Sequence, residues 1–364
     1  MKVRFTKEKF LEGLQQVQNI VSTRSTLPIL SNVLIRAHKD KISLTTTDLD
    51  VTVQCAIEAT VVREGSVTLP ARRLFTIIRE LEHAEVEMEV DDKNAATILS
   101  GGSCFVIVGI AESEFPQLPK LSGAKSFSLE QKVLRAAFKK TSYAMSTDEA
   151  RYVLNGVLLS LKDDKLVVVA TDGRRLALAE QEIDLPKDTK GELLIPSKTV
   201  LEIYRLLKDK GTVTISFTEN QVSCALDGTH LVSKLIDGIY PNYRQVIPAE
   251  VKERISLERE SFHQAVRRAA LLVSERNHAV KLHFTKNNLS IRAHAPDVGE
   301  SKESLAINYK GPDITIGFNP DYLIDPLRNL DHDEIFFELT DSLSPGVIKV
   351  NAPFLYVIMP LRVG

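Results

Sequence analysis

Apolar residues recur at helical spacing in six windows of the chain, and strand-like runs separate these windows. In residues 7–20 the apolar side chains follow the i, i+3, i+4, i+7 spacing of one helix face. This face consists of Phe10, Gly13, Leu14 and Val17. The other windows are residues 71–82, 130–142, 197–210, 259–271 and 320–330. Each window predicts an amphipathic helix.

The order of the predicted elements repeats along the chain. Residues 155–161 and 165–171 read as two strands joined by a polar turn, and an Asp172-Gly173 turn leads into a third strand. The same order of a helix followed by strands occurs in residues 10–53 and, more faintly, in residues 262–307. A strand that runs into a helix also recurs, as VTLPARRLFTIIREL, LLIPSKTVLEIYRLL and ITIGFNPDYLIDPLRNL. The chain therefore predicts three copies of one domain of roughly 120 residues, a size that can bury its own core.

We expect the three domains at residues 1–122, 126–248 and 249–364, with a short polar linker before the second. The predicted fold class is α+β, with two helices packed on antiparallel sheets in each copy. Pro326 should kink or shorten the last helix. Exposed sheet edges invite unwanted pairing, which a repeated domain avoids by pairing its edge with the next copy. With a constant rotation between copies, three domains of one chain or six domains of two chains could close into a ring; the residues alone leave both open.

Composition narrows the class of protein. The chain has 364 residues, of which 43% are hydrophobic and 26% are charged, as is typical of a soluble globular protein. Its net charge of −2 does not by itself indicate a nucleic-acid binder. The helical windows, however, carry an excess of Lys and Arg, and the remainder is acidic. Solvated helix faces are usually mixed in sign, so the excess favours helices that share one basic surface.

The sequence predicts neither export, nor a membrane span, nor a metal site. The cysteines Cys55, Cys104 and Cys224 lie in strand-like runs without CxxC pairing, so we expect all three to be buried. There is no charged-then-apolar leader and no apolar run of membrane length, which predicts a cytoplasmic protein. His278 and His283 would lie on opposite faces of a strand, which argues against a shared metal ion.

Catalytic motifs are missing as well. The chain has no GxxxxGK[ST], GxGxxG, GxSxG or HExxH pattern. Asp48 and Asp172 follow strands at equivalent positions of two repeats, and aspartate is a usual turn former there, so we interpret both as turn residues. An enzyme that acts on nucleotides through Asp172 and Arg174 is the alternative from a different class. We expect no catalytic residue and no cofactor.

Seven blocks of sequence stand out, which are, in chain order, TLPILSN, TLPARRLF, FPQL, RYVLNG, ATDGRRLA, SKLIDGIYPNYRQVIP and YVIMPLR. In this order they resemble the bacterial DNA polymerase III beta subunit family, the sliding clamps, and the resemblance covers essentially the whole chain. It implies three domains of one topology in each of two chains, joined head to tail as a ring. Helices would line the hole and sheets would form the outer wall.

The resemblance implies a processivity factor of the replicative polymerase holoenzyme that encircles duplex DNA and tethers its partners by enclosure. The implied partners are duplex DNA of any sequence, single-stranded template, the replicative polymerase alpha subunit, the clamp loader, other polymerases, repair proteins and a second copy of the chain. Phosphate contacts carry no base information, so such a ring stays free to slide. A divergent accessory clamp with a restricted set of partners is the alternative within the same fold.

Several residues match the family's nucleic-acid contacts. Arg24 and Arg73 resemble the duplex contacts, and Tyr152 and Val153 lie where the family contacts single-stranded template. Val153 replaces a position that is often aromatic. We add Lys198 because it lies on the outward face of a predicted helix.

The family also binds a short peptide, typically a glutamine followed by leucine and aromatic residues, in a cleft between the second and third domains. The matching residues are Thr171, Leu176, Pro241, Val246, Val357, Met359 and Leu361, with Arg151, Leu154, Arg174 and Tyr322 around them. Apolar anchors in a preformed groove suit the recognition of short peptides. Gln245, in place of a usual basic residue, and the Ser344-Pro345-Gly346 loop, in place of a serine pair, predict altered partner affinity.

The resemblance also implies which residues join the two chains of the ring. Phe105 and Ile107 of the first domain should meet Leu271 and Leu272 of the other chain's third domain. Strand pairing should continue across this joint.

Overall fold

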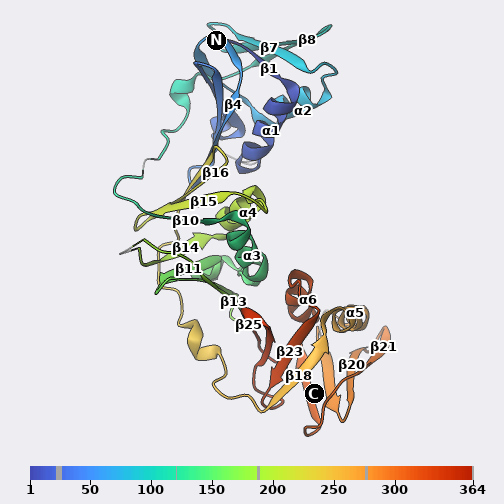
Figure 1. Cartoon of the computed structure of the whole chain (residues 1–364). Coiled ribbons are helices and arrows are strands. Elements are labelled where there is room, and N and C mark those ends of the chain that lie inside the picture. Colours follow the sequence, from blue (N-terminus) through green and yellow to red (C-terminus); the bar gives the residue numbers. More distant parts are fainter. Residues whose placement is uncertain (22–26, 120, 187–188, 275–277, 363–364) are drawn as a thin grey trace. The chain divides into compact units, whose positions relative to one another are not determined.

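The computed structural model describes the chain apart from residues 22–26, 120, 187–188, 275–277 and 363–364 (Figure 1). It forms two compact units, Met1–Lys132 with Glu202–Leu235, and Val133–Leu201 with Ile236–Gly364. The division falls inside two helices, α3 (Gln131–Thr141) and α4 (Ser197–Leu206). The middle repeat therefore contributes strands to both units.

The first unit contains two antiparallel sheets. Its five-strand sheet has the order β5 (Thr60–Arg63), β1 (Lys2–Thr6), β7 (Glu85–Val90), β8 (Ala95–Ser100) and β9 (Ser103–Val108). Its eight-strand sheet has the order β10 (Lys125–Glu130), β15 (Thr212–Phe217), β16 (Gln221–Leu226), β17 (Thr229–Lys234), β4 (Val51–Glu58), β3 (Lys41–Thr47), β2 (Asn32–His38) and β6 (Gly65–Pro70).

The helices α1 (Lys7–Val17) and α2 (Ala71–Glu80) pack against each other and against strands of both sheets (Figure 1). As its spacing predicts, α1 buries one face, which consists of Phe10, Gly13, Leu14 and Val17. The last turn of α1 has no basic residue of its own. Instead, the Arg205 guanidinium donates to the carbonyl oxygens of Gln15 (3.1 Å) and Gln16 (2.6 Å), which places a cation at the negative end of the helix.

The second unit also contains two antiparallel sheets. We call the larger the second eight-strand sheet, and its order is β14 (Gly191–Pro196), β11 (Gly156–Lys162), β12 (Lys165–Thr171), β13 (Arg175–Glu182), β25 (Ala352–Ile358), β24 (Gly346–Val350), β23 (Glu334–Leu339) and β18 (Glu253–Glu258). The four-strand sheet has the order β21 (Gly299–Ala306), β20 (Asn288–Ala295), β19 (Val280–Thr285) and β22 (Ile314–Phe318). The helices α5 (Arg259–Ala270) and α6 (Pro320–Asn329) pack side by side (Figure 1).

Short 3-10 helices complete the described part of the chain; they are η1 (Gln18–Ile20), η2 (Pro28–Ser31), η3 (Glu112–Glu114), η4 (Ser142–Ala144), η5 (Glu149–Leu154) and η6 (Tyr243–Val246). The predicted hairpin of the middle repeat is confirmed within one residue, because β11 and β12 span Gly156–Lys162 and Lys165–Thr171. Its two turn residues, Asp163 and Asp164, have φ angles of 53° and 55°. Positive φ at both positions gives the turn a twist that matches its strands.

Neighbouring repeats share sheets, as the edge-strand argument predicts. In the first unit β17 of the middle repeat pairs with β4 of the first, from Thr229 opposite Cys55 to Ser233 opposite Val51. In the second unit β13 pairs with β25 of the third repeat, from Arg175 opposite Ile358 to Ala179 opposite Phe354. Each of these joints satisfies the main-chain groups of two strands that would otherwise be edges.

Pro326 lies inside α6 without making it shorter than the equivalent helices α2 and α4, so the shortening that the sequence offered as one outcome is not seen. The helix has 10 residues, as do α2 and α4. A proline at this position removes the amide that would bond to the carbonyl oxygen of Tyr322. The hydroxyl of Tyr356 donates to that oxygen instead, at 2.7 Å, so the helix continues to Asn329.

Candidate binding surfaces

A buried arginine organises the elements around the predicted peptide cleft. The Arg175 side chain, 10% exposed, bonds to the carboxylates of Asp172 (3.0 Å) and Asp325 (2.5 Å) and to the carbonyl oxygen of Tyr143 (2.6 Å). Its guanidinium also lies 4.5 Å from the centre of the Tyr322 ring, which is a cation–π contact. Burial opposes the charged form of Arg175, but the neighbouring Tyr356, Asp325 and Asp172 outweigh it and raise the already high pKa of the guanidinium further. Arg175 therefore ties the turn before β13 to α6 by charge-assisted bonds.

The turn interpretation of Asp48 and Asp172 is confirmed. One carboxylate oxygen of Asp172 accepts from the amides of Arg174 (2.9 Å) and Arg175 (3.1 Å). Asp48 does the same for Asp50 (3.1 Å) and Val51 (2.7 Å). A carboxylate that caps the amides two and three residues later is a local structural device, and its repetition follows from the repeated fold.

Three predicted cleft residues form one row across neighbouring strands. Thr171 of β12 lies opposite Leu176 of β13, which lies opposite Val357 of β25. All three are buried. Leu176 and Val357 belong to an apolar cluster with Leu158 and Val169. Side chains of the segment 240–247, namely Tyr240, Tyr243 and Ile247, pack against this cluster.

The remaining predicted cleft residues differ in exposure. Met359, 40% exposed, follows β25 and is fixed by its amide, which donates to the Arg174 carbonyl (2.9 Å). The Leu361 amide donates to Gly317 (2.8 Å). Leu154 is buried, Tyr322 is half-buried, and the exposed set is Arg151, Arg174, Pro241, Val246 and Leu361.

Gly173 allows the chain to turn beside this surface. Its φ is 84°, and a side chain there would begin 2.9 Å from the Arg151 guanidinium. The Arg151 guanidinium in turn donates to the carbonyl oxygen of Asp172 at 3.0 Å. The positive φ therefore favours glycine here, whereas the end of the exposed Arg151 side chain could move aside.

Sequence reasoning missed a pocket next to these residues, which we call the Tyr243 pocket. It has a volume of about 590 Å³ and lies over β11 and β12 of the second eight-strand sheet, beside the segment 240–244. The residues that line it include Leu158, Ser160, Lys165, Val167, Glu180 and Tyr243. Only Pro241 among the predicted cleft residues lines it. Its residues come from strands and a loop far apart in sequence, so no local pattern marks it.

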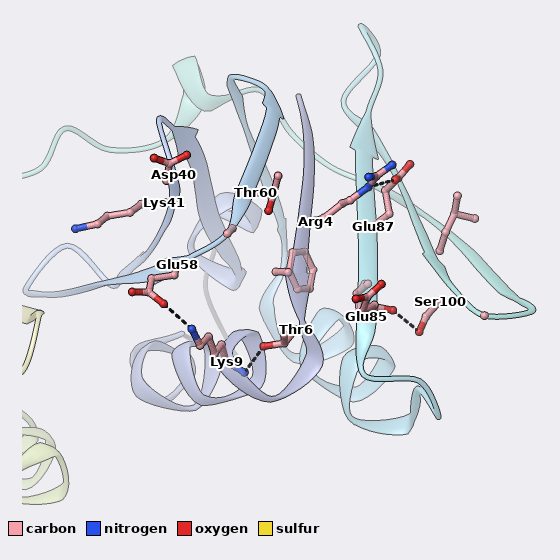
Figure 2. A pocket seen from close by; sticks show the side chains of 15 residues that line it. Arg4, Thr6, Lys9, Asp40, Lys41, Glu58, Thr60, Glu85, Glu87 and Ser100 are labelled. Carbon is pink, nitrogen blue, oxygen red and sulfur yellow. Dashed lines mark hydrogen bonds and ion pairs between the residues drawn. The ribbon is translucent and has the colours of Figure 1, made fainter.

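A larger pocket, of about 880 Å³, lies in the first unit near the start of α1 (Figure 2). Four of its charged side chains form two ion pairs, which Figure 2 shows, Lys9 with Glu58 (2.5 Å) and Arg4 with Glu87 (2.7 Å). It contains none of the predicted site residues. Such ion pairs near the surface contribute little to stability, and they satisfy these four charges without a ligand.

The predicted nucleic-acid contacts that the structure describes lie on three different elements, α2, η5 and α4. Arg73 is exposed on α2 in the first unit, and Arg24 lies outside the described residues. Tyr152 and Val153 lie in η5 of the second unit, Tyr152 exposed and Val153 half-buried. Lys198 is exposed in the first turn of α4.

Phe105 and Ile107 lie in β9, and Leu271 and Leu272 follow α5, which packs on β21; β9 and β21 each end their sheet. Phe105 is exposed, whereas Ile107 is 5% exposed and packs in its own domain. Leu271 is 79% exposed at the end of α5, and Leu272 is half-buried.

Two details next to this proposed joint follow from the fold. Arg268 forms two bonds to the Glu303 carboxylate (3.1 and 2.6 Å), which pin α5 to β21 and lower the pKa of that carboxyl.

Cys104 is exposed, which corrects the prediction that all three cysteines are buried. Its side chain alternates with that of buried Ile107 and so lies on the opposite face of β9. Burial raises the pKa of the other two thiols, Cys55 and Cys224, to about 12.

Comparison with known proteins identifies the family of this chain. Models of the N-terminal, central and C-terminal domains of the DNA polymerase III beta subunit match residues 1–119, 128–242 and 244–362. The chain belongs to the DNA polymerase III beta subunit family. A beta sliding clamp of Chlamydia muridarum is 36% identical over 100% of this chain and 99% of its own, and that of Bacillus subtilis is 32% identical over the full length of both.

Solved structures of this family agree with the fold. Sliding clamps from Pseudomonas aeruginosa, bound to griselimycin, and from Bacillus subtilis superpose with TM-scores of 0.95 and 0.96 at 32% and 31% identity, each over 100% of both chains. The chain is thus built of three tandem clamp domains and acts as a replicative sliding clamp, in a family of processivity factors. No helix in the described part is long and apolar enough to cross a membrane.

Proposed function

We propose that two copies of this chain close head to tail into a ring around duplex DNA and hold polymerases on the template by enclosure. The carrying observation is the match to three beta subunit domains along the whole chain. The sheets that run from one repeat into the next support it. So do the strands β9 and β21, which end their sheets and could pair between copies. The domain boundaries that we propose are 1–122, 126–248 and 249–364.

Contact with DNA is assigned to residues that carry no base information. Arg24, Arg73 and Lys198 would neutralise phosphates of the duplex, and Tyr152 with Val153 would contact single-stranded template. Phosphate contacts of this kind hold any sequence equally well and let the ring slide.

Partners would bind through a short peptide in the cleft of the second unit. The buried row of Thr171, Leu176 and Val357 would form its floor, and the exposed Met359 and Leu361 would close over apolar side chains of the peptide. The partners that this proposal includes are the replicative polymerase alpha subunit, the clamp loader, other polymerases and repair proteins. Because these partners replicate and repair the bacterial chromosome, the ring would act in the cytoplasm.

The test of enclosure compares circular DNA with cut DNA. The protein is loaded on nicked circular duplex with a clamp loader, separated from free protein, and the DNA is then cut once. We expect the protein to stay on the circle and to leave the linear molecule within the time of a gel-filtration run. Equal retention on both would contradict enclosure, because it would mean that affinity alone holds the protein.

A catalytic role for Asp172 is disfavoured by its contacts. Both oxygens of its carboxylate are engaged, one by two amides of the turn and the other by Arg175. Turnover of a nucleotide panel that is lost in Asp172→Asn would overturn the proposal that the chain has no catalytic residue. Restored growth of a clamp-depleted cell would exclude the accessory clamp, which serves only part of the partner set.

A further inference from the structure

The Tyr243 pocket continues the apolar surface of the proposed peptide cleft. Leu158 lines the pocket and also belongs to the apolar cluster that contains Leu176 and Val357. Leu158 lies opposite Val169 across β11 and β12. Val169 is two residues from Thr171, so the pocket floor and the cleft row lie on the same face of the sheet.

The segment that crosses this face contributes to both places. Tyr240 and Tyr243 pack on the apolar cluster and also line the pocket. Pro241 lines the pocket and is one of the proposed cleft residues. A chain lying in the cleft therefore reaches the pocket by passing along the segment 240–244, without crossing to another surface.

Charged side chains, namely Lys162, Asp163, Lys165, Glu180, Glu192 and Arg244, line part of the pocket, but its floor favours an apolar side chain. Its floor includes Leu158, which is buried, and Val167, which is half-buried. On the rim, Lys165 binds Glu180 at 2.6 Å, so these two charges already satisfy each other. An apolar side chain on the floor gains from leaving water and breaks no ion pair.

We propose that the Tyr243 pocket binds residues that flank the clamp-binding motif of a partner protein, with an aliphatic or aromatic side chain on Leu158 and Val167. The proposal rests on the proposed function, because it needs a partner peptide in the neighbouring cleft. The pocket would add a second contact with the partner. Partners that share the same motif would then differ in affinity according to the residues that flank the motif.

The test uses three fluorescent synthetic peptides and the whole protein. One carries a glutamine, a leucine and a phenylalanine in that order. The other two add about five residues with a central leucine, at one end or the other, which reach about 17 Å when extended. The protein variants are Val167→Lys and Ser160→Arg, which fill the pocket, and Val298→Lys as a control at an exposed site away from it.

We expect one of the longer peptides to bind about tenfold more tightly than the short one, as burial of one leucine would give. Both pocket variants should lose this gain and keep the affinity for the short peptide, while Val298→Lys keeps both. Equal affinity of all three peptides for the unaltered protein would overturn the pocket assignment. So would a gain that survives both pocket variants. If the short peptide itself does not bind, the proposed cleft fails first, and the two failures are thereby distinguished.

Discussion

The hydroxyl of Tyr356 donates to the carbonyl oxygen of Tyr322 across 2.7 Å, and it replaces the amide that Pro326 cannot supply. Tyr356 is fully buried, and burial raises the pKa of its hydroxyl, which therefore stays a donor. The bond joins the last strand of the chain to the helix that carries Tyr322. A tolerated proline in α6 thus depends on a residue far along the sequence.

Removing this donor should destabilise the second unit. We expect Tyr356→Phe to lower the free energy of unfolding by about 1–3 kcal/mol, because the carbonyl of Tyr322 loses its partner. Urea unfolding followed by circular dichroism measures the change. In a Pro326→Ala background the helix regains its own amide, so the same substitution should cost less. Equal costs in the two backgrounds would refute the coupling.

The proposed DNA contacts predict a change in salt dependence. Arg24→Ala together with Arg73→Ala should lower the slope of log affinity against log salt by about two, since each lost phosphate contact removes about 0.9. Binding to duplex DNA is measured by anisotropy between low and moderate salt. Lys93→Ala, an exposed residue in a turn, is the control and should leave the slope unchanged. An unaltered slope in the double variant would remove Arg24 and Arg73 from the interface.

If charged residues are introduced at the proposed joint between the two chains, we expect the protein to become a monomer. Leu271 is 79% exposed in a single chain, and Leu271→Asp with Leu272→Asp would place two carboxylates where two apolar surfaces meet. Light scattering should then report the mass of one chain instead of two. Leu343→Asp, at another highly exposed leucine, should remain a dimer. A dimeric double variant would show that the joint lies elsewhere.

The proposed cleft predicts a loss of peptide binding without a loss of the ring. Met359→Ser with Leu361→Ser should weaken binding of a glutamine-leucine-phenylalanine peptide by at least about tenfold, since two apolar contacts are removed. Fluorescence anisotropy measures the affinity, and light scattering checks the dimer. Val298→Ser, at an exposed valine elsewhere, should bind the peptide as the unaltered protein does. Unchanged affinity in the double variant would exclude these two residues from the cleft.

Because of His263, we expect the protein to become less stable as the pH falls. Burial lowers its pKa below the ordinary 6.5, against the opposing effect of Glu260 and in line with that of Arg259, Arg267 and Arg328. Neither ring nitrogen has a hydrogen-bond partner within the described residues. The unfolded chain therefore binds a proton more readily, and stability declines as the pH drops below about 6.5.

The test of this pH effect compares melting temperatures at pH 7.5 and 5.5. His263→Leu should narrow the difference between the two, because it removes the group that is neutral when folded. His294→Gln, at an exposed histidine, should leave the difference as it is. An equally large difference in His263→Leu would show that other groups cause the loss.

Local patterns predicted the elements but not the long-range contacts that complete them. The buried face of α1 and the β11–β12 hairpin depend on neighbours in sequence, so spacing and turn residues were sufficient. The contact of Arg205 with the end of α1 and the compensation of Pro326 by Tyr356 join distant segments, which no local window contains.

The candidate site shows the same division. The turn role of Asp172 could be inferred because its partners follow it directly. The exposure of Cys104 could not be inferred in this way. Side chains of a strand point alternately to its two faces, and the sequence of β9 does not indicate which face packs against the core. The Tyr243 pocket needs the fold itself, because the segment 240–244 meets β11 and β12 only in three dimensions.

The joints between repeats consist of main-chain bonds, from β17 to β4 and from β13 to β25. Peptide groups are the same whatever residue carries them, so the hydrogen bonds of such a seam do not depend on side-chain identity, which matters only for the buried side chains such as Leu176 and Val357. Exposed residues of both strands can therefore change while the two strands stay hydrogen-bonded to each other. The solved clamps that share only 32% and 31% of their residues with this chain keep the same architecture, which agrees with joints of this kind.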